Sequence, residues 1–241
     1  MRPIITLTTD FGTADGYVGE MKGVILSGGI DVNVVDITHD IPPQDVERAR
    51  LTVARVWRRF PAGTIHVVVV DPGVGSSRAA LAVGSNERFL IGPDNGVLSP
   101  ALLLPDARAV RLPVPSHASA TFHGRDVFAP AAAAIARGES IESLGEAMAD
   151  PIIRRTPEAK RLRDGSIEGQ VIAIDRFGNA ITNLIAPRGG TILVDGRSIA
   201  IRKTYAEVAS GDPVAVTGST GFIEVAIRDG SAAGGERFCQ A

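Results

Sequence analysis

The residues best suited to chemistry in this sequence are Asp71 and Arg78, which lie in the stretch TIHVVVVDPGVGSSR. Residues 67–70 are all valine, and such an apolar run is typical of a strand buried on both faces of a sheet. The run passes through Asp71 into a turn at 72–75. Ligands of open α/β sheets bind just beyond the carboxyl ends of strands, so we predict that Asp71 and Arg78 hold the reacting water of an enzyme. The alternative is an aspartate that only caps the turn.

A second carboxylate, Asp10, ends another predicted strand at 4–8 and should lie at the same sheet edge as Asp71. A carboxylate there can accept two hydrogen bonds from a ribose diol, although a turn aspartate explains the residue equally well. The G-x-G spacing at 73–75 does not predict dinucleotide binding. Arg78 occupies the third glycine position, and a strand follows where a helix N-terminus is needed.

Two segments combine histidine with carboxylates, at 36–40 and at 123–126. Neither has the spacing of a zinc signature, since H-E-x-x-H and paired C-x-x-C are both absent. We therefore predict no metal site. We expect His39 to be structural and His123 to lie near a strand end, where a helix opens.

The candidate ligand residues of the C-terminal half lie in turns. The segment 175–179, DRFGN, is either a hairpin turn or a loop in which the Asn179 amide reads a purine edge. The segment 219–224 is likewise either a turn or a ligand loop. Tyr205 can stack on a base, although a lone aromatic residue is more often part of a core.

The N-terminal half shows the order of an α/β fold. Strands are predicted at 4–8, 32–37 and 67–70, and amphipathic helices at 17–25 and 46–56, which indicates a mostly parallel sheet flanked by helices. We expect further strands at 79–83, 88–91 and 109–112. An alanine-rich helix should follow 122–126 and reach Ala136, and a last helix is expected at 141–148.

The composition changes at the charged run TPEAKRLRDG, where we place a domain boundary. The N-terminal α/β domain is predicted to cover 1–160 and the C-terminal domain 166–241. In the second domain, strands are predicted at 170–175, 180–184, 191–194, 198–202, 213–216 and 222–227. Short strands at regular spacing are typical of a small all-β barrel.

The bulk composition excludes several classes of protein. Of 241 residues, 44% are hydrophobic and 22% charged, and the net charge of -2 gives no reason to expect nucleic acid or a membrane as partner. No apolar run approaches the roughly 20 residues of a membrane span, and the N-terminus lacks the pattern of a signal peptide. The single cysteine, Cys239, excludes an intrachain disulfide and fits a cytoplasmic location.

Six motifs together resemble one family: TTDFG-x-x-D-x-Y-V-G-x-M-K-G, VVDPGVGSSR, GPDNGVLS, TFHGRDVFAP, DRFGNAITN and S-x-G-F-I-E-V-A. They span nearly the whole chain, in order. The chain is similar to the S-adenosylmethionine (SAM) hydroxide adenosyltransferases, adenosine-forming SAM hydrolases related to fluorinase and chlorinase. The resemblance implies an α/β domain, a C-terminal β-barrel and a homotrimer. It also implies active sites between the N-terminal domain of one subunit and the C-terminal domain of the next.

The resemblance also implies residue roles, with SAM as substrate and no metal or cofactor. Asp71, Arg78 and His123 would hold the water or hydroxide, and Asp10 would bind the ribose hydroxyls. The adenine would contact Asn179, Phe177 and Tyr205. The methionine portion would contact Asp175 and Ser219, with Glu224 nearby.

Two departures from the fluorinase pattern favour hydrolysis. The fluorinase has a tyrosine where this chain has Asp71, and tyrosine-serine in place of His123-Gly124. A carboxylate beside the halide position would repel an anion, so we expect water to attack the ribose C5′ and release adenosine and methionine. Asp71 or His123 would take the proton, and the fixed charge of Arg78 would stabilise developing hydroxide. A SAM-dependent 5′-halogenase and a nonenzymatic adenosine or SAM binding module are the alternatives.

Overall fold

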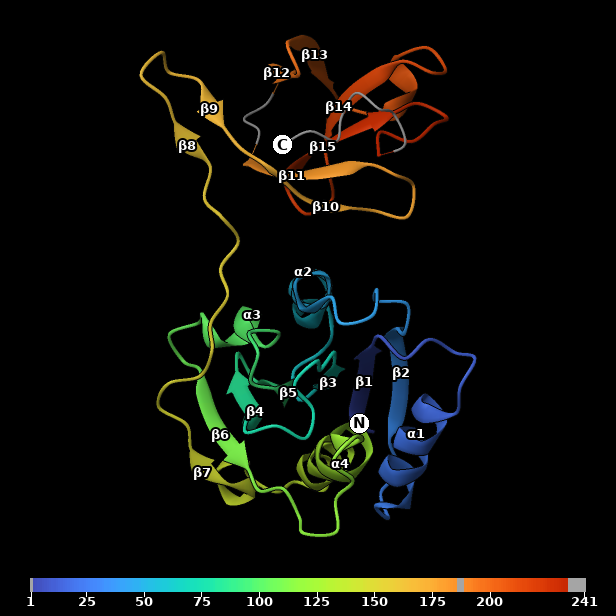
Figure 1. Cartoon of the computed structure of the whole chain (residues 1–241), viewed down its shortest axis with the longest axis vertical. Coiled ribbons are helices and arrows are strands. Elements are labelled where there is room, and N and C mark those ends of the chain that lie inside the picture. The colour runs from blue at the N-terminus through green and yellow to red at the C-terminus, as the bar shows by residue number, and fades with distance from the viewer. Residues whose placement is uncertain (1, 186–188, 234–241) are drawn as a thin grey trace. The chain divides into compact units, whose positions relative to one another are not determined.

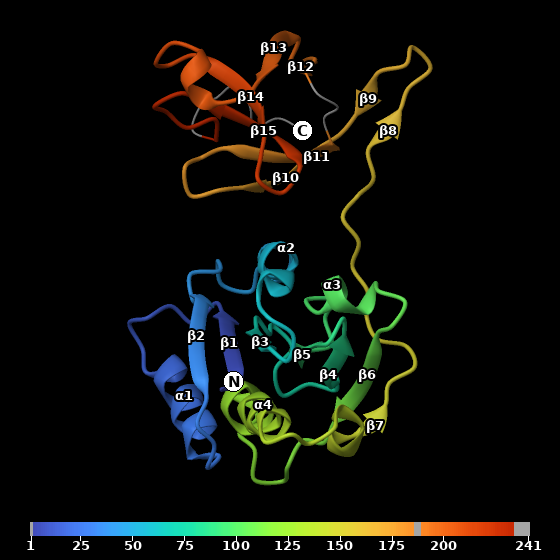
Figure 2. The ribbon, with the colours of Figure 1, turned by 180° about the vertical axis from the view of Figure 1, so that it is seen from behind.

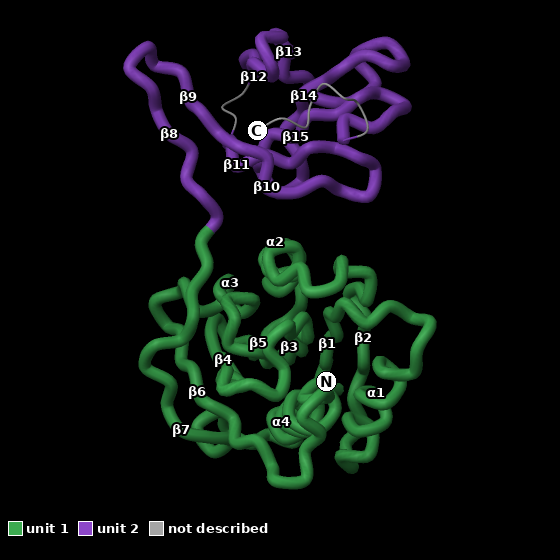
Figure 3. Tube along the Cα trace, viewed as in Figure 1, with its two compact units in different colours: residues 1–155 green, residues 156–241 purple. Residues whose placement is uncertain are grey.

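The computed structural model of the chain describes residues 2–185 and 189–233 (Figure 1). The chain divides into two compact units, unit 1 at 1–155 and unit 2 at 156–241 (Figure 3). The division falls at the start of the charged run. Cys239 lies outside the described residues.

Unit 1 is built on a sheet with the strand order β2-β1-β3-β5-β4-β6-β7. The first four strands in this order run parallel, whereas β4, β6 and β7 each run antiparallel to a neighbour. The mostly parallel, helix-flanked sheet is therefore confirmed. The strand bounds are β1 Ile4–Thr9, β2 Asn33–Thr38, β3 Ile65–Val69, β4 Ala80–Ser85, β5 Arg88–Pro93, β6 Arg108–Leu112 and β7 Glu146–Ala147.

Helices cover both faces of this sheet (Figure 2). One core contains buried side chains of α1 and α4, and the other contains those of α2, Trp57 and α3. Strand β3 contributes to both, because Val67 and Val69 belong to the first core and Val68 to the second, as does Val70 directly after the strand. The helix bounds are α1 Tyr17–Ser27, α2 Val46–Val56, α3 Ser99–Leu102 and α4 Ala129–Ala136, with 3-10 turns at Trp57–Arg59 and Ile141–Leu144 and a π turn at Gly124–Phe128.

The chain reverses direction after β3, and the loop that makes this reversal carries Asp71 and Arg78. Strand β5 is parallel to β3, and β4 is antiparallel to β5, so β4 begins at the edge where β3 ends. The residues between these strands, 70–79, therefore form a loop along that edge. Its Gly75 has a φ of 75°, and an added Cβ would lie 2.3 Å from the Ala120 carbonyl oxygen, so this close approach requires glycine.

The predicted helix at 141–148 is wrong. The chain makes only the 3-10 turn Ile141–Leu144 and then joins the sheet edge as β7, antiparallel to β6. Gly145 allows this, because its extended backbone passes so close to Arg111 that an added Cβ would lie 2.0 Å from the Arg111 carbonyl oxygen. The pairing of β7 with β6 and the close approach of Gly145 to Arg111 outweigh the local helical pattern.

Unit 2 is all-β in its described part, apart from a 3-10 turn at Tyr205–Glu207. Its main sheet has the order β10-β11-β15-β14-β13-β12 and curls into a half-barrel around a core that includes Ile192, Ile223 and Val225. The predicted small β domain is confirmed. The bounds are β8 Lys160–Arg161, β9 Ile167–Glu168, β10 Val171–Ile174, β11 Ala180–Ile185, β12 Thr191–Val194, β13 Arg197–Arg202, β14 Pro213–Thr217 and β15 Phe222–Ile227.

Candidate active site

The carboxyl ends of β1 and β3 bring Asp10 and Asp71 to one edge of the unit 1 sheet. These strands are parallel neighbours, and their last residues, Thr9 and Val69, are in register. Asp10 follows β1 directly, and Asp71 follows β3 after one further valine. Both aspartates line a pocket of about 420 Å³. The complete lining is Asp10, Phe11, Tyr17, Pro43, Gln44, Val69, Asp71, Pro72, Val74, Thr121, His123 and Gly124.

Asp71 and Arg78 form a bidentate ion pair beside this pocket. Arg78 Nε donates to Asp71 Oδ1 over 2.9 Å, and Arg78 Nη2 donates to Asp71 Oδ2. The side chains are only 6% and 10% exposed, for Asp71 and Arg78 respectively. The guanidinium also donates to the Ala79 carbonyl and lies 5.4 Å from the centre of the Phe128 ring. Arg78 is thus a fixed, largely desolvated positive charge, whose field acts more strongly than it would in water.

His123 completes the cluster at the start of the π turn that leads into α4. Its Nδ1 lies 3.0 Å from Arg78 Nη2. A guanidinium has donors only, so Nδ1 must be the acceptor, and His123 is neutral with its proton on Nε2. Burial, followed by the Arg78 charge, lowers the pKa of His123, while Asp71 and Asp126 oppose that shift. His123 therefore offers the pocket an N–H donor.

The loop that precedes α2 holds the Asp10 side chain. Its Oδ2 accepts the Gln44 main-chain N–H over 2.8 Å. Its other oxygen, Oδ1, has no hydrogen-bond partner within 2–185 and 189–233, and so can accept from a ligand hydroxyl.

Three aromatic side chains pack together at the pocket. Ring centres of Phe11 and Tyr17 lie 5.8 Å apart, and Phe122 lies 5.8 Å from Phe11 and 5.4 Å from Tyr17. Sequence reasoning missed this cluster and also missed Gln44. The aromatic residues in TDFG and DGYVG were a usable signal, but Phe122 lies far along the chain from both, and only the fold brings it against them.

His39 is a structural residue, as expected. Its Nδ1 bonds Thr9 Oγ1 over 2.8 Å, and its Nε2 lies 3.1 Å from Asp36 Oδ1. Thr9 Oγ1 in turn accepts the Phe11 N–H over 3.2 Å. These contacts connect the segment that carries Asp10 to the end of β2 and the residues that follow it. In the described part of the chain, no cluster of three or more His, Cys, Asp or Glu side chains is arranged to hold a metal ion.

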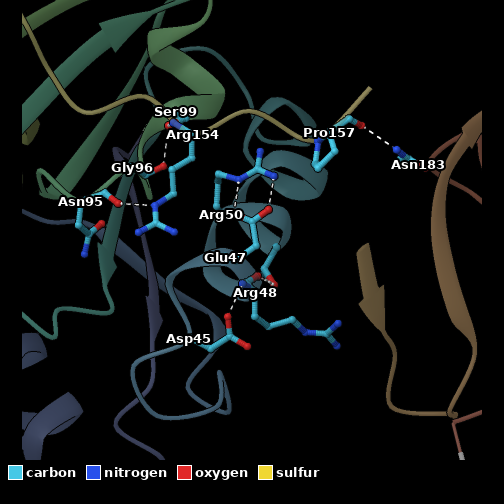
Figure 4. Close-up of polar contacts among 11 residues, drawn as sticks. Asp45, Glu47, Arg48, Arg50, Asn95, Gly96, Ser99, Arg154, Pro157 and Asn183 are labelled. Carbon is cyan, nitrogen blue, oxygen red and sulfur yellow. Dashed lines mark hydrogen bonds and ion pairs between the residues drawn. The ribbon is translucent and has the colours of Figure 1, made fainter. Parts of the chain in front are cut away.

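At the end of unit 1, Arg154 clamps the segment 95–99 (Figure 4). Arg154 donates from its main-chain N–H to Ser99 Oγ and from Nε to the Asn95 carbonyl, each over 2.8 Å. The Asn95 amide donates to the Val70 carbonyl over 2.9 Å. The last residues of unit 1 are thereby linked to the residue that precedes Asp71.

The candidate residues of unit 2 form two bonded pairs. Asp175 Oδ1 accepts the main-chain N–H groups of Phe177 and Asn179, each over 2.9 Å, and Oδ2 accepts Asn179 Nδ2 over 3.0 Å. Tyr205 donates to Glu224 Oε2 over 2.9 Å. Burial, followed by this bond, raises the pKa of Tyr205 to about 12, and the Asp175 charge adds to the shift. Strand pairing brings the two pairs close together, because Ala180, next to Asn179, lies opposite Val225, next to Glu224.

The other two candidates of unit 2 are exposed. Phe177 projects from its turn with 77% of its surface exposed. Ser219 lies in the exposed turn between β14 and β15, directly after Gly218. An added Cβ at Gly218 would lie 1.8 Å from Glu224 Oε1, so the buried carboxylate of Glu224 sits against this turn.

Comparison with known proteins places the chain in a family. A model of the SAM hydroxide adenosyltransferase N-terminal domain matches residues 5–145, and one of the C-terminal domain matches residues 169–235. The chain belongs to the SAM hydroxide adenosyltransferase family. The family resemblance in the sequence motifs is thereby confirmed.

Several relatives extend along nearly the whole chain. A protein of Thermus thermophilus named (R)-S-adenosyl-L-methionine hydrolase is 44% identical, covering 96% of this chain and 94% of that protein. A fluorinase of Actinopolyspora mzabensis is 31% identical, with coverages of 93% and 90%. A crystal structure of an uncharacterized conserved protein from Thermotoga maritima matches with a TM-score of 0.85 at 29% identity, with coverages of 95% and 94%.

Proposed function

We propose that this protein hydrolyses SAM to adenosine and methionine. The observation that carries the proposal is the desolvated Asp71–Arg78 pair with His123 beside it, at the edge of a pocket that also contains Asp10. Named relatives along nearly the whole chain support the same reaction.

The proposed step is an in-line displacement at the ribose C5′. One water oxygen forms the bond to C5′ as the bond from C5′ to the sulfonium sulfur breaks, and the sulfur leaves as a neutral thioether with the electron pair. The water proton goes to Asp71, because the Nδ1 lone pair of His123 is already directed at Arg78. His123 Nε2–H orients the oxygen, and the Arg78 charge stabilises its hydroxide character. The negative charge that develops on the attacking oxygen and the positive charge of the sulfonium cancel in this step, so a site poor in water favours it.

Position 124 supports hydrolysis over halide transfer. An added Cβ at Gly124 would meet Met21 Sδ at 3.2 Å, Phe122 Cε2 at 3.3 Å and Val69 Cγ1 at 3.4 Å. A serine at this position, as in the fluorinase pattern, would require Met21 and Phe122 to shift by a few tenths of an ångström. The Asp71 carboxylate would also repel a halide ion.

The remaining substrate contacts are proposed for unit 2. Asn179, with one N–H held by Asp175, keeps its carbonyl oxygen and second N–H for the adenine edge, and Phe177 and Tyr205 supply aromatic surface. The carboxylates of Asp175 and Glu224, together with Ser219, suit the charged amino acid end. Relatives are named for the (R) epimer at sulfur, and we extend that preference to this chain.

We further propose a cytoplasmic homotrimer whose sites are shared between subunits, with no metal or cofactor. In the described residues, no helix has the length and apolar character needed to cross a membrane. Mixing subunits tests a shared site. An Arg78→Lys protein and an Asn179→Ala protein, each impaired, should regain activity when unfolded and refolded together, because some mixed sites are intact. A site contained in one subunit would regain none.

The decisive experiment incubates the pure protein with SAM and separates the products by chromatography. Equal amounts of adenosine and methionine are expected, with unchanged rates after exhaustive chelation. A 5′-halogenated nucleoside formed in chloride or fluoride would support halide transfer instead. Stoichiometric binding of adenosine without turnover would identify a binding module and refute the proposal.

A further inference from the structure

Gln44 occupies a backbone position that normally belongs to glycine. The Asp45 N–H donates to the Pro42 carbonyl over 3.0 Å, which closes a turn with Pro43 and Gln44 as its central residues. Gln44 has a φ of 66°. Proline followed by a residue of positive φ is the pattern of a type II turn, in which glycine or asparagine is the usual third residue. A glutamine in this conformation is strained.

The strained residue faces the candidate site in two ways. Its main-chain N–H donates to Asp10 Oδ2 over 2.8 Å, and glycine could make the same bond. Its side chain is exposed rather than packed in a core, so burial does not explain why glutamine is present. Gln44 also lines the pocket that contains Asp10, Asp71 and His123. The side chain is therefore placed where it can touch a ligand bound by Asp10.

We propose that Gln44 is a substrate-binding residue whose carboxamide contacts the sugar of the bound nucleoside. A carboxamide both donates and accepts, and so can pair with a sugar hydroxyl next to the one that Asp10 Oδ1 accepts. The turn holds this group in place, while its N–H fixes the other oxygen of Asp10. This inference rests on the proposed function, because it takes the pocket to bind a nucleoside.

The chain contains a matched control. Glu87, in the turn between β4 and β5, is also exposed, with a φ of 57°, and does not line the pocket. Gln44→Gly and Glu87→Gly should relieve the same backbone strain and shift the melting temperature in the same direction. Only Gln44→Gly should raise KM for SAM, by about 3- to 10-fold, with a smaller change in kcat.

Gln44→Ala separates the carboxamide from backbone flexibility, because alanine retains Cβ and the strained conformation. It should raise KM as much as Gln44→Gly does. A wild-type KM in both variants, or a change confined to the glycine variant, would overturn the proposal. Titration of the same proteins with adenosine measures the contact without turnover, and weaker binding by both variants is expected. Wild type that releases no adenosine from SAM refutes the proposed function, whereas active wild type with unaffected variants refutes only the role of Gln44.

Discussion

Asp71 in unit 1 and Asp175 in unit 2 arise from the same sequence pattern, a short strand followed by aspartate and a turn. Asp71 is paired with a guanidinium brought back by the chain reversal. Asp175 instead accepts N–H groups of its own turn and the Asn179 amide. One pattern therefore produces a charged pair beside a pocket in unit 1 and a turn closed by its own hydrogen bonds in unit 2. We expect damage to the first to affect the rate and damage to the second to affect binding.

The units also differ in their response to acid. All four histidines of the chain lie in unit 1, and burial lowers the pKa of two of them, His66 and His123. Unit 2 has none. A fall in pH below neutrality should therefore destabilise unit 1 first.

The largest effect is expected from Arg78→Lys. Lysine keeps the charge but not the planar fork that holds Asp71 and meets His123, so kcat should fall by about 10²- to 10³-fold. Adenosine release at saturating SAM measures kcat, and a thermal melt should show little loss of stability. The control is Arg108→Lys, in the exposed pair with Glu142. A kcat near that of wild type would remove the basis for assigning catalysis to unit 1.

The second prediction concerns the acid sensitivity of unit 1. Burial lowers the pKa of His66 to about 4, and Arg88 adds to the shift while a bond to the Trp57 main chain opposes it. The unfolded chain, with a pKa near 6.5, binds more protons between these values, so stability falls as the pH drops through that window. Between pH 6.5 and 5, the loss should be on the order of 2 kcal/mol.

The only tryptophan, Trp57, is buried in unit 1, so its fluorescence during urea unfolding reports on this unit. His66→Gln should be less stable at neutral pH but should show a flatter pH dependence. The same slope as in wild type would mean that another group causes the acid sensitivity. Hydrogen exchange in β14 and β15 should change little over this range, since unit 2 has no histidine.

In unit 2, Asp175→Asn should mainly affect binding. The new amide would face Asn179 Nδ2 with a donor where an acceptor is needed, which loosens the orientation of Asn179. We expect KM for SAM to rise about 10-fold, with a smaller change in kcat. Asp195→Asn, in the turn between β12 and β13, is the control. A selective loss of kcat would contradict the division of roles between the units.

The smallest effect is expected from Arg154→Ala. The variant loses the bond from Nε to the Asn95 carbonyl but keeps its main-chain bond to Ser99. Stability should fall by about 1 kcal/mol and kcat by no more than about 3-fold. The neighbouring exposed Arg155→Ala serves as control. Equal effects of the two variants would show that the clamp does not support the Asp71 edge.

The sequence predicted those parts of the site that depend on local pattern. The valine run identified β3, and the turn residues after Asp71 marked its end at the sheet edge. The tautomer of His123 was not predictable, because it depends on a contact with Arg78 across 45 positions. Gln44 was missed because its conformation contradicts its residue type, and only the folded turn reveals that conflict.

Because the chain reverses after β3, Asp71 and Arg78 lie in one short segment rather than on two distant elements. Their mutual alignment depends on this segment and on the few residues that contact it, among them Ala120, His123 and Phe128. A transplant of the segment from β3 to β4 into another protein would therefore have to bring these contacts with it. The host sheet would also need a strand in the place of β5, which lies between β3 and β4.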